Sequence, residues 1–147
     1  MLTIRTIVDD MSLCLLYGSP QDYPKPCSAK DIKLLENLFV SQFGMTFLKA
    51  YKTILRQSNG ISYNTLVIWP LEYPSSSQET IFEVNHKFQE TISRDYIFFA
   101  RFDNKLFGYK VSEDVFCSID AIEKDQPCQV FEDSEKMFLH LLKQAWQ

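Results

Sequence analysis

The sequence predicts a single-domain α+β fold in which helices pack against a central sheet rich in antiparallel strands. Two observations carry this prediction. Apolar residues recur at helical spacing between Ser28 and Gly60, and again from Ser134 towards the end of the chain. Between these regions, residues 96–119 form β-branched and aromatic runs separated by short polar turns, which indicates an antiparallel meander.

The composition supports one globular domain with a substantial core. A chain of 147 residues can bury about two thirds of its unfolded surface. It contains 12 Phe, 7 Tyr and 2 Trp, and 46% of its residues are hydrophobic. The formal charge of −4 disfavours direct binding to nucleic acid or to an anionic membrane, because both call for clustered Lys and Arg.

The sequence also predicts a cytoplasmic location. No apolar run approaches the roughly 18 residues of a membrane helix. The stretch 1–5 lacks the basic and then apolar order of a signal peptide.

Residues 1–27 are expected to be a variable N-terminal extension of a core that spans residues 28–146. Apolar residues between Ile4 and Leu16 have partly helical spacing, which predicts a short helix. Proline and glycine residues then predict a loop over residues 18–27.

Two helices are predicted next in the chain. Ser28 and Asp31 have the spacing of a helix cap, and this first helix should run to about Gln42. The second helix is predicted over Gly44–Gly60, where Asn59-Gly60 should end it. Its apolar face contains Phe47, Leu48, Tyr51, Ile54 and Leu55, and its basic, solvated face contains Lys49, Lys52, Arg56 and Gln57.

The rest of the chain is predicted to be mainly sheet. A first strand region covers 63–71, a surface loop covers 74–78 and a helix covers 79–91. Three strands follow at 96–102, 106–111 and 115–119, of which the first is apolar enough to lie in the middle of the sheet. Residues 128–131 form an edge strand or an extended connection, and Asp133 or Ser134 caps a final helix.

No catalytic, cofactor-binding or metal-binding residue is predicted. His86 and His140 have no neighbour at a zinc-ligand spacing, and no glycine-rich phosphate loop is present. A triad of Cys117, His86 and an Asp is a possible alternative that the sequence does not specifically support. We expect Cys14, Cys27, Cys117 and Cys128 to be free thiols, with the bridges Cys14–Cys27 and Cys117–Cys128 as the alternative for an exported protein.

The acidic residues are concentrated in the last third of the chain. Residues 103–135 contain nine Asp and Glu against three Lys, whereas the remainder contains ten acidic and twelve basic residues. Such a concentration is compatible with a merely solvated face, but it would also attract a basic partner. The candidate partner-binding residues in or beside loops are Glu113, Asp114, Asp120, Glu123, Asp125, Glu132 and Asp133.

The order of motifs resembles the SUKH superfamily of Smi/Knr-type domains. The resemblance covers about residues 28–146. It rests on residues 47–55 leading to Ser58-Asn59-Gly60, on Asn85, and on the strand 97–101 running into Asp103 and Tyr109. Phe131-Glu132-Asp133-Ser134 before Phe138-Leu139 also fits the pattern.

This resemblance implies a non-catalytic α+β domain that binds and neutralises a cognate bacterial toxin, commonly a nuclease or a deaminase. An acidic protein is suited to cover the basic groove with which a nuclease holds phosphate. The alternative is a regulatory or scaffolding module that binds a resident cellular protein. The family's interaction surfaces vary, so the resemblance assigns no partner-binding residue.

Overall fold

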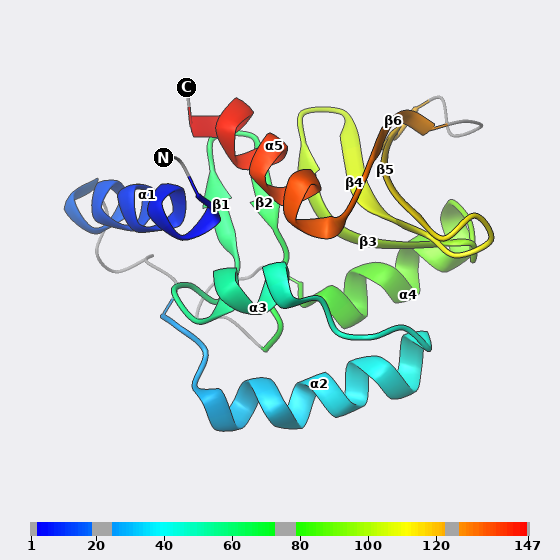
Figure 1. Cartoon of the computed structure of the whole chain (residues 1–147), viewed down its shortest axis with the longest axis horizontal. Coiled ribbons are helices and arrows are strands. Elements are labelled where there is room, and N and C mark those ends of the chain that lie inside the picture. The colour runs from blue at the N-terminus through cyan, green and yellow to red at the C-terminus, as the bar shows by residue number, and fades with distance from the viewer. Residues whose placement is uncertain (1–2, 19–24, 73–78, 123–126, 147) are drawn as a thin grey trace.

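The computed structural model describes residues 3–18, 25–72, 79–122 and 127–146 (Figure 1). Within these ranges, helices and one antiparallel sheet form the predicted α+β fold. Among the helices of the described ranges, none is both long and apolar enough to cross a membrane. The helices are α1 (Ile4–Gly18), α2 (Ala29–Phe43), α3 (Lys49–Leu55), α4 (Ile81–Thr91) and α5 (Ser134–Trp146). The strands are β1 (Ile61–Tyr63), β2 (Leu66–Ile68), β3 (Tyr96–Phe102), β4 (Lys105–Lys110), β5 (Val115–Asp120) and β6 (Pro127–Phe131).

The six strands lie in the sheet in the order in which they occur in the chain, and each pairs antiparallel with the next. The tight turns β1–β2, β3–β4 and β4–β5 each contain a residue with positive φ, namely Asn64, Asp103 and Asp114. Asn and Asp tolerate this conformation better than other non-glycine residues. The predicted meander, the internal position of β3 and the edge position of β6 are confirmed.

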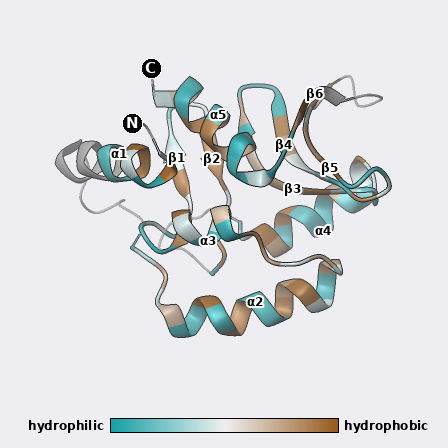
Figure 2. Cartoon of the chain, in the orientation of Figure 1, coloured by the Kyte–Doolittle hydropathy of each residue, from teal (hydrophilic) through white to brown (hydrophobic). Residues whose placement is uncertain are grey.

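Two layers of helices cover opposite faces of the sheet, and neighbouring residues of β3 pack against different layers. The Phe98 ring lies 5.4 Å from the Phe88 ring of α4. The Phe99 ring lies 5.4 Å from Tyr51 of α3 and 6.0 Å from Phe138 of α5. This alternation follows from the two-residue period of a strand, and it explains why β3 is apolar on both faces. Figure 2 shows the hydrophobic strands lying between helices with hydrophilic outer sides.

Helix α2 begins at the predicted cap and ends at the predicted glycine. The Ser28 side chain accepts a hydrogen bond from the Asp31 N–H, which satisfies one of the free donors of the first turn. Gly44 has φ +68° and donates its N–H to the Val40 carbonyl. Ile32 and Phe39 of this helix are buried, whereas Leu38 is 43% exposed.

The helix predicted over Gly44–Gly60 is shorter than expected. Helix α3 comprises only Lys49–Leu55, because residue Leu48 has an extended backbone with φ −74° and ψ 128°. Phe47 and Leu48 are nevertheless buried. In the sequence, their apolar side chains continue the helical spacing, and the helix was therefore predicted to start too early. In the structure they reach the core from an extended connection between α2 and α3.

The predicted first strand region over 63–71 is also corrected. It contains part of a two-stranded hairpin, in which Ile61 pairs with Ile68 and Tyr63 pairs with Leu66. The turn lies at Asn64, which adopts φ +53°. The sequence pattern concealed this turn because the apolar run continues directly after it. The predicted surface loop at 74–78 lies outside the described residues.

Helix α1 is longer than the short helix predicted, and it contributes to the core. Ile4, Ile7, Val8 and Met11 are buried, and α1 packs against α5 and α3. The core therefore includes side chains that precede Ser28. Of the loop predicted over 18–27, residues 19–24 lie outside the described part of the chain and Gly18 ends the helix.

Candidate functional site

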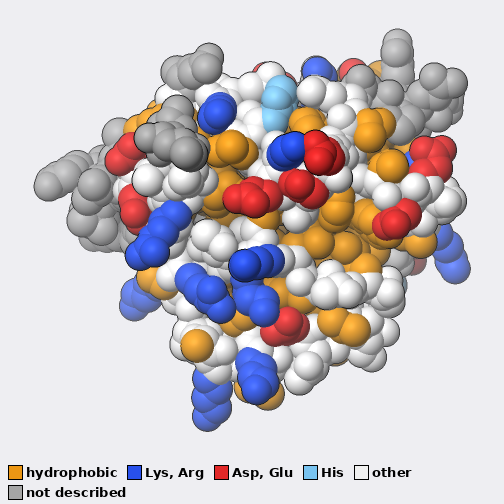
Figure 3. Space-filling view, viewed as in Figure 1, with side chains coloured by type: hydrophobic (Ala, Val, Ile, Leu, Met, Phe, Trp, Pro, Cys, Tyr) orange, Lys and Arg blue, Asp and Glu red, His pale blue; other side chains and the backbone are white. Residues whose placement is uncertain are grey.

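An apolar groove lies between the α2–α3 connection and the end of the β4–β5 hairpin. Its volume is about 390 Å³. Figure 3 shows hydrophobic side chains gathered to the right of centre, with acidic side chains around them. We call this feature the apolar groove, and its lining residues are Phe43, Gly44, Met45, Thr46, Leu48, Tyr109, Val111, Asp114 and Phe116.

One wall of the apolar groove is the extended connection that follows Gly44. Rings anchor both ends of this connection to the core, because Phe43 lies 4.8 Å and Phe47 lies 5.1 Å from the ring of Phe39. The left-handed backbone of Gly44 turns the chain away from the axis of α2. The packing of these rings therefore holds the connection, and with it this wall of the groove, in place.

The other wall comes from β4, β5 and their turn. Tyr109 and Phe116 pair across the two strands, with ring centroids 5.2 Å apart. Val111 is 47% exposed at the mouth of the groove. The Tyr109 hydroxyl donates to Asp114 Oδ1. This hydrogen bond, together with burial and the Asp114 charge, raises the pKa of Tyr109, so the phenol stays protonated at neutral pH.

Four of the seven predicted acidic residues lie at the same end of the sheet. Glu113 and Asp114 belong to the β4–β5 turn. Because Phe116 pairs with Phe131, Glu132 and Asp133 leave β6 beside the start of β5. Asp120 lies at the opposite end of β5, where its Oδ1 accepts from the Ile122 N–H. Glu123 and Asp125 lie outside the described residues.

Several of these carboxylates already have partners within the chain. Glu113 pairs with Lys110 at 2.9 Å, and Glu132 pairs with Lys136. Asp133 accepts from the Lys136 N–H at 2.8 Å and thereby caps α5. Asp114 is the acidic residue that lines the apolar groove. It is therefore the carboxylate best placed to meet a basic group of a molecule bound there.

The motif residues Asn59 and Asn85 lie in the interior as structural residues. Asn59 Oδ1 accepts from the Leu71 N–H at 3.0 Å, and its Nδ2 donates to the Glu72 carbonyl. Asn85 is fully buried, with its Oδ1 accepting from the Phe98 N–H and its Nδ2 donating to the Phe98 carbonyl. These side chains satisfy backbone groups that would otherwise be buried without partners.

His86 and Cys117, the residues of the alternative catalytic triad, lie on different elements, α4 and β5. The His86 side chain is 81% exposed and faces Glu90, whereas Cys117 is buried in β5. Cys27 is a buried free thiol, which removes the alternative of a Cys14–Cys27 bridge. Among the described residues, no group of three or more His, Cys, Asp and Glu side chains is arranged to hold a metal ion.

A basic face lies apart from the apolar groove and was underestimated from the sequence. Residues 25–56 contain six Lys and Arg but only two acidic residues. The sequence predicted only the part of this charge that Lys49, Lys52 and Arg56 contribute. The packing of α2 beside α3 brings Lys33 to the same groove as Lys52 and Arg56, and Figure 3 shows basic side chains gathered at the lower left.

No protein-family model matches this chain, and no curated protein matches it.

Proposed function

We propose that this chain is a non-catalytic, cytoplasmic domain that binds and neutralises a cognate bacterial toxin domain of the nuclease or deaminase type. The observation that carries the proposal is the apolar groove with Asp114 at its side. Protein-binding surfaces combine apolar and aromatic side chains with charged groups at the rim. The lining of this groove contains Phe43, Val111 and Phe116 together with the carboxylate of Asp114.

The charge around the groove favours a basic partner. Asp114 lines it, and Glu113, Glu132 and Asp133 lie at the same end of the sheet. Nucleases and nucleic-acid deaminases hold phosphates with basic side chains. A surface of this kind would be attracted to the acidic end of the chain, while an apolar side chain beside it enters the groove.

The resemblance to the SUKH superfamily supports the same proposal. Asn59, Gly60 and Asn85 are motif positions, and here they hold segments of the fold together. A family that shares such interior residues can vary its surface and so recognise different toxins.

The proposal is tested by identifying the partner. A tagged form of the chain is purified from its native host, and co-purifying chains are identified by mass spectrometry at low and high salt. We expect a stoichiometric complex with the C-terminal domain of an exported toxin, and weaker capture at high salt. A complex with a resident cytoplasmic protein alone would argue against a toxin-neutralising role.

The second candidate function is that of a regulatory or scaffolding module. The basic face over α2 and α3 favours it, because a chain with an acidic and a basic surface can hold two partners of opposite charge. Two resident proteins in the same captured complex would support this function.

A further inference from the structure

We propose that the groove between α2 and α3 is a second docking site, which binds an acidic segment of a partner protein. Its volume is about 280 Å³. We call it the basic groove, and it is lined by Ala29, Ile32, Lys33, Glu36, Lys52 and Arg56. It shares no lining residue with the apolar groove.

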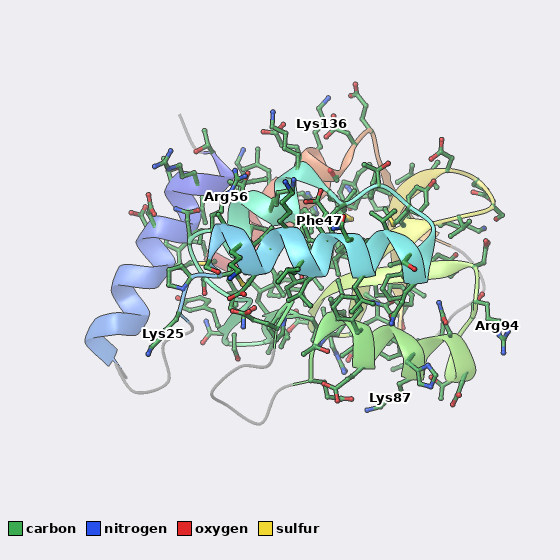
Figure 4. The ribbon with its side chains drawn as sticks, turned by 90° about the horizontal axis from the view of Figure 1, so that it is seen from below. Lys25, Phe47, Arg56, Lys87, Arg94 and Lys136 are labelled. Atoms are coloured by element: carbon green, nitrogen blue, oxygen red, sulfur yellow. The ribbon has the colours of Figure 1, made fainter. Side chains whose placement is uncertain are left out.

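Two cations of the basic groove remain available to a partner. Lys33 and Arg56 are exposed, and neither side chain has an ion-pair partner within the described part of the chain. Lys33 belongs to α2 and Arg56 directly follows α3, so they flank the groove from both sides. Figure 4 places Arg56 beside the N-terminal half of α2. An Arg side chain in this position can hold a carboxylate through two parallel hydrogen bonds.

The middle of the basic groove already holds a carboxylate. Glu36 Oε1 lies 3.1 Å from Lys52 Nζ, and the two side chains are only 29% and 25% exposed. This half-buried pair joins α2 to α3 across the groove, so the charge of Lys52 is already balanced by a carboxylate of the chain. A partner's carboxylates would then occupy the flanking positions beside Lys33 and Arg56.

The lining favours a protein over a nucleic acid. Single-stranded nucleic acid is usually bound by aromatic rings that stack on its bases, and none of the described residues that line the basic groove is aromatic. Glu36 would repel a continuous row of phosphates. Ala29 instead is exposed and provides apolar surface for aliphatic carbons, whereas Ile32 is buried. An acidic protein segment with interspersed aliphatic residues matches both features.

The test measures binding of a fluorescein-labelled peptide with the repeated sequence Glu-Glu-Leu, twelve residues long, by fluorescence anisotropy. The variant K33E/R56E reverses the two available charges. The matched control R94E/K143E reverses two exposed charges elsewhere and changes the net charge equally; Figure 4 places Arg94 at the far end of the molecule from Arg56. Circular dichroism confirms that each variant is folded.

We expect the wild type and the control to bind the peptide with similar affinity at 20 mM NaCl, and K33E/R56E to bind at least about tenfold more weakly. Binding by the wild type should weaken several-fold at 200 mM NaCl, because exposed charges are screened. The proposal is overturned if the wild type does not bind the peptide, or if both variants lose affinity equally. It is also overturned if a twelve-nucleotide oligothymidylate binds the basic groove more tightly than the peptide.

Discussion

At the scale of single residues, Gly60 shows how closely the chain is packed where α3 leads into β1. Its φ is +84°, and a Cβ atom added there would lie 2.7 Å from the Ile68 carbonyl oxygen and 2.9 Å from the Pro70 nitrogen. Both obstacles are backbone atoms, which cannot rotate away. Asn59, the preceding residue, binds the same segment through its side chain. The pair therefore closes the β1–β2 hairpin against the end of α3.

The substitution Gly60→Ala should destabilise the fold by at least about 2 kcal/mol, because it adds a steric clash to a left-handed backbone. Gly44→Ala is the matched control, since Gly44 also has positive φ but an added Cβ would meet nothing within 4 Å. It should cost only about 1 kcal/mol. Urea unfolding measures both values. If both variants lost the same unfolding free energy, the predicted clash at Gly60 would not be present.

Cys27 should react slowly with thiol reagents in the native state. Burial, followed by the charges of Glu72 and Asp31, raises the pKa of its thiol to about 12. The thiolate is the reactive form, so its population at pH 8 is about a thousandfold below that of an ordinary thiol with a pKa of 9.0. In a variant that retains Cys27 as its one cysteine, we expect iodoacetamide to label it at least about a hundredfold faster in denaturant. Rapid labelling without denaturant would contradict the burial.

Glu72 should make the fold less stable as the pH rises. Burial and the neighbouring Asp31 raise its pKa in the folded state above the ordinary value of 4.5. A carboxyl group with a raised folded pKa stabilises the fold below its unfolded pKa, and this contribution is lost as the pH rises through the folded value. Glu72→Gln should therefore increase the unfolding free energy at pH 7 and reduce its pH dependence between pH 4 and 7. A variant less stable than the wild type at pH 7 would contradict this account.

At the scale of elements, Asn85 connects helix α4 to the central strand. Besides its two hydrogen bonds to Phe98, its Nδ2 donates to the Ile81 carbonyl at 2.9 Å. The strand has a register irregularity between Phe98 and Ala100. Asn85 thus supplies partners at the place where the regular ladder is interrupted, and it fixes α4 on this face of the sheet.

The substitution Asn85→Ala should cost about 3 kcal/mol, because it leaves the buried N–H and C=O of Phe98 without their side-chain partners. The exposed Asn37 of α2 is the control, and Asn37→Ala should change stability by less than about 0.5 kcal/mol. Thermal and urea unfolding give the comparison. A loss below about 1 kcal/mol for Asn85→Ala would indicate that solvent replaces the side chain.

Elements whose ends are marked by local cap residues were predictable from the sequence. Elements whose apolar spacing fits more than one backbone conformation were not. Ser28 and Gly44 delimit α2 by cap chemistry, which acts over a few residues and is visible in sequence. The start of α3 was missed because Phe47 and Leu48 continue the apolar spacing of the helix in the sequence. In the structure both side chains are buried, but they belong to the extended segment before α3. The β1–β2 turn was missed because Asn64 is not followed by the glycine that usually accompanies asparagine in a tight hairpin turn.

At the scale of the whole molecule, the chain separates its charges over different surfaces. Acidic residues lie at the end of the sheet that carries the apolar groove, and basic residues lie on α2 and α3 (Figure 3). The sequence indicated the acidic residues but not the groove, because its walls come from residues 43–48 and 109–116. Only the tertiary fold brings these segments together. The strand register likewise separates Asp120 from Asp114, although both belong to the same acidic stretch.

The most direct test of the proposed function is the affinity of the captured toxin domain for the variant Val111→Arg, measured by surface plasmon resonance. Val111 is exposed at the apolar groove, so its replacement should leave the fold intact while placing a long cation in the contact surface. Leu34→Arg makes the same kind of change at a residue of α2 that is 60% exposed and lies outside the groove. We predict that Val111→Arg weakens binding at least about tenfold and that Leu34→Arg does not. Unchanged affinity of Val111→Arg would contradict the assignment of the apolar groove as the toxin-binding surface.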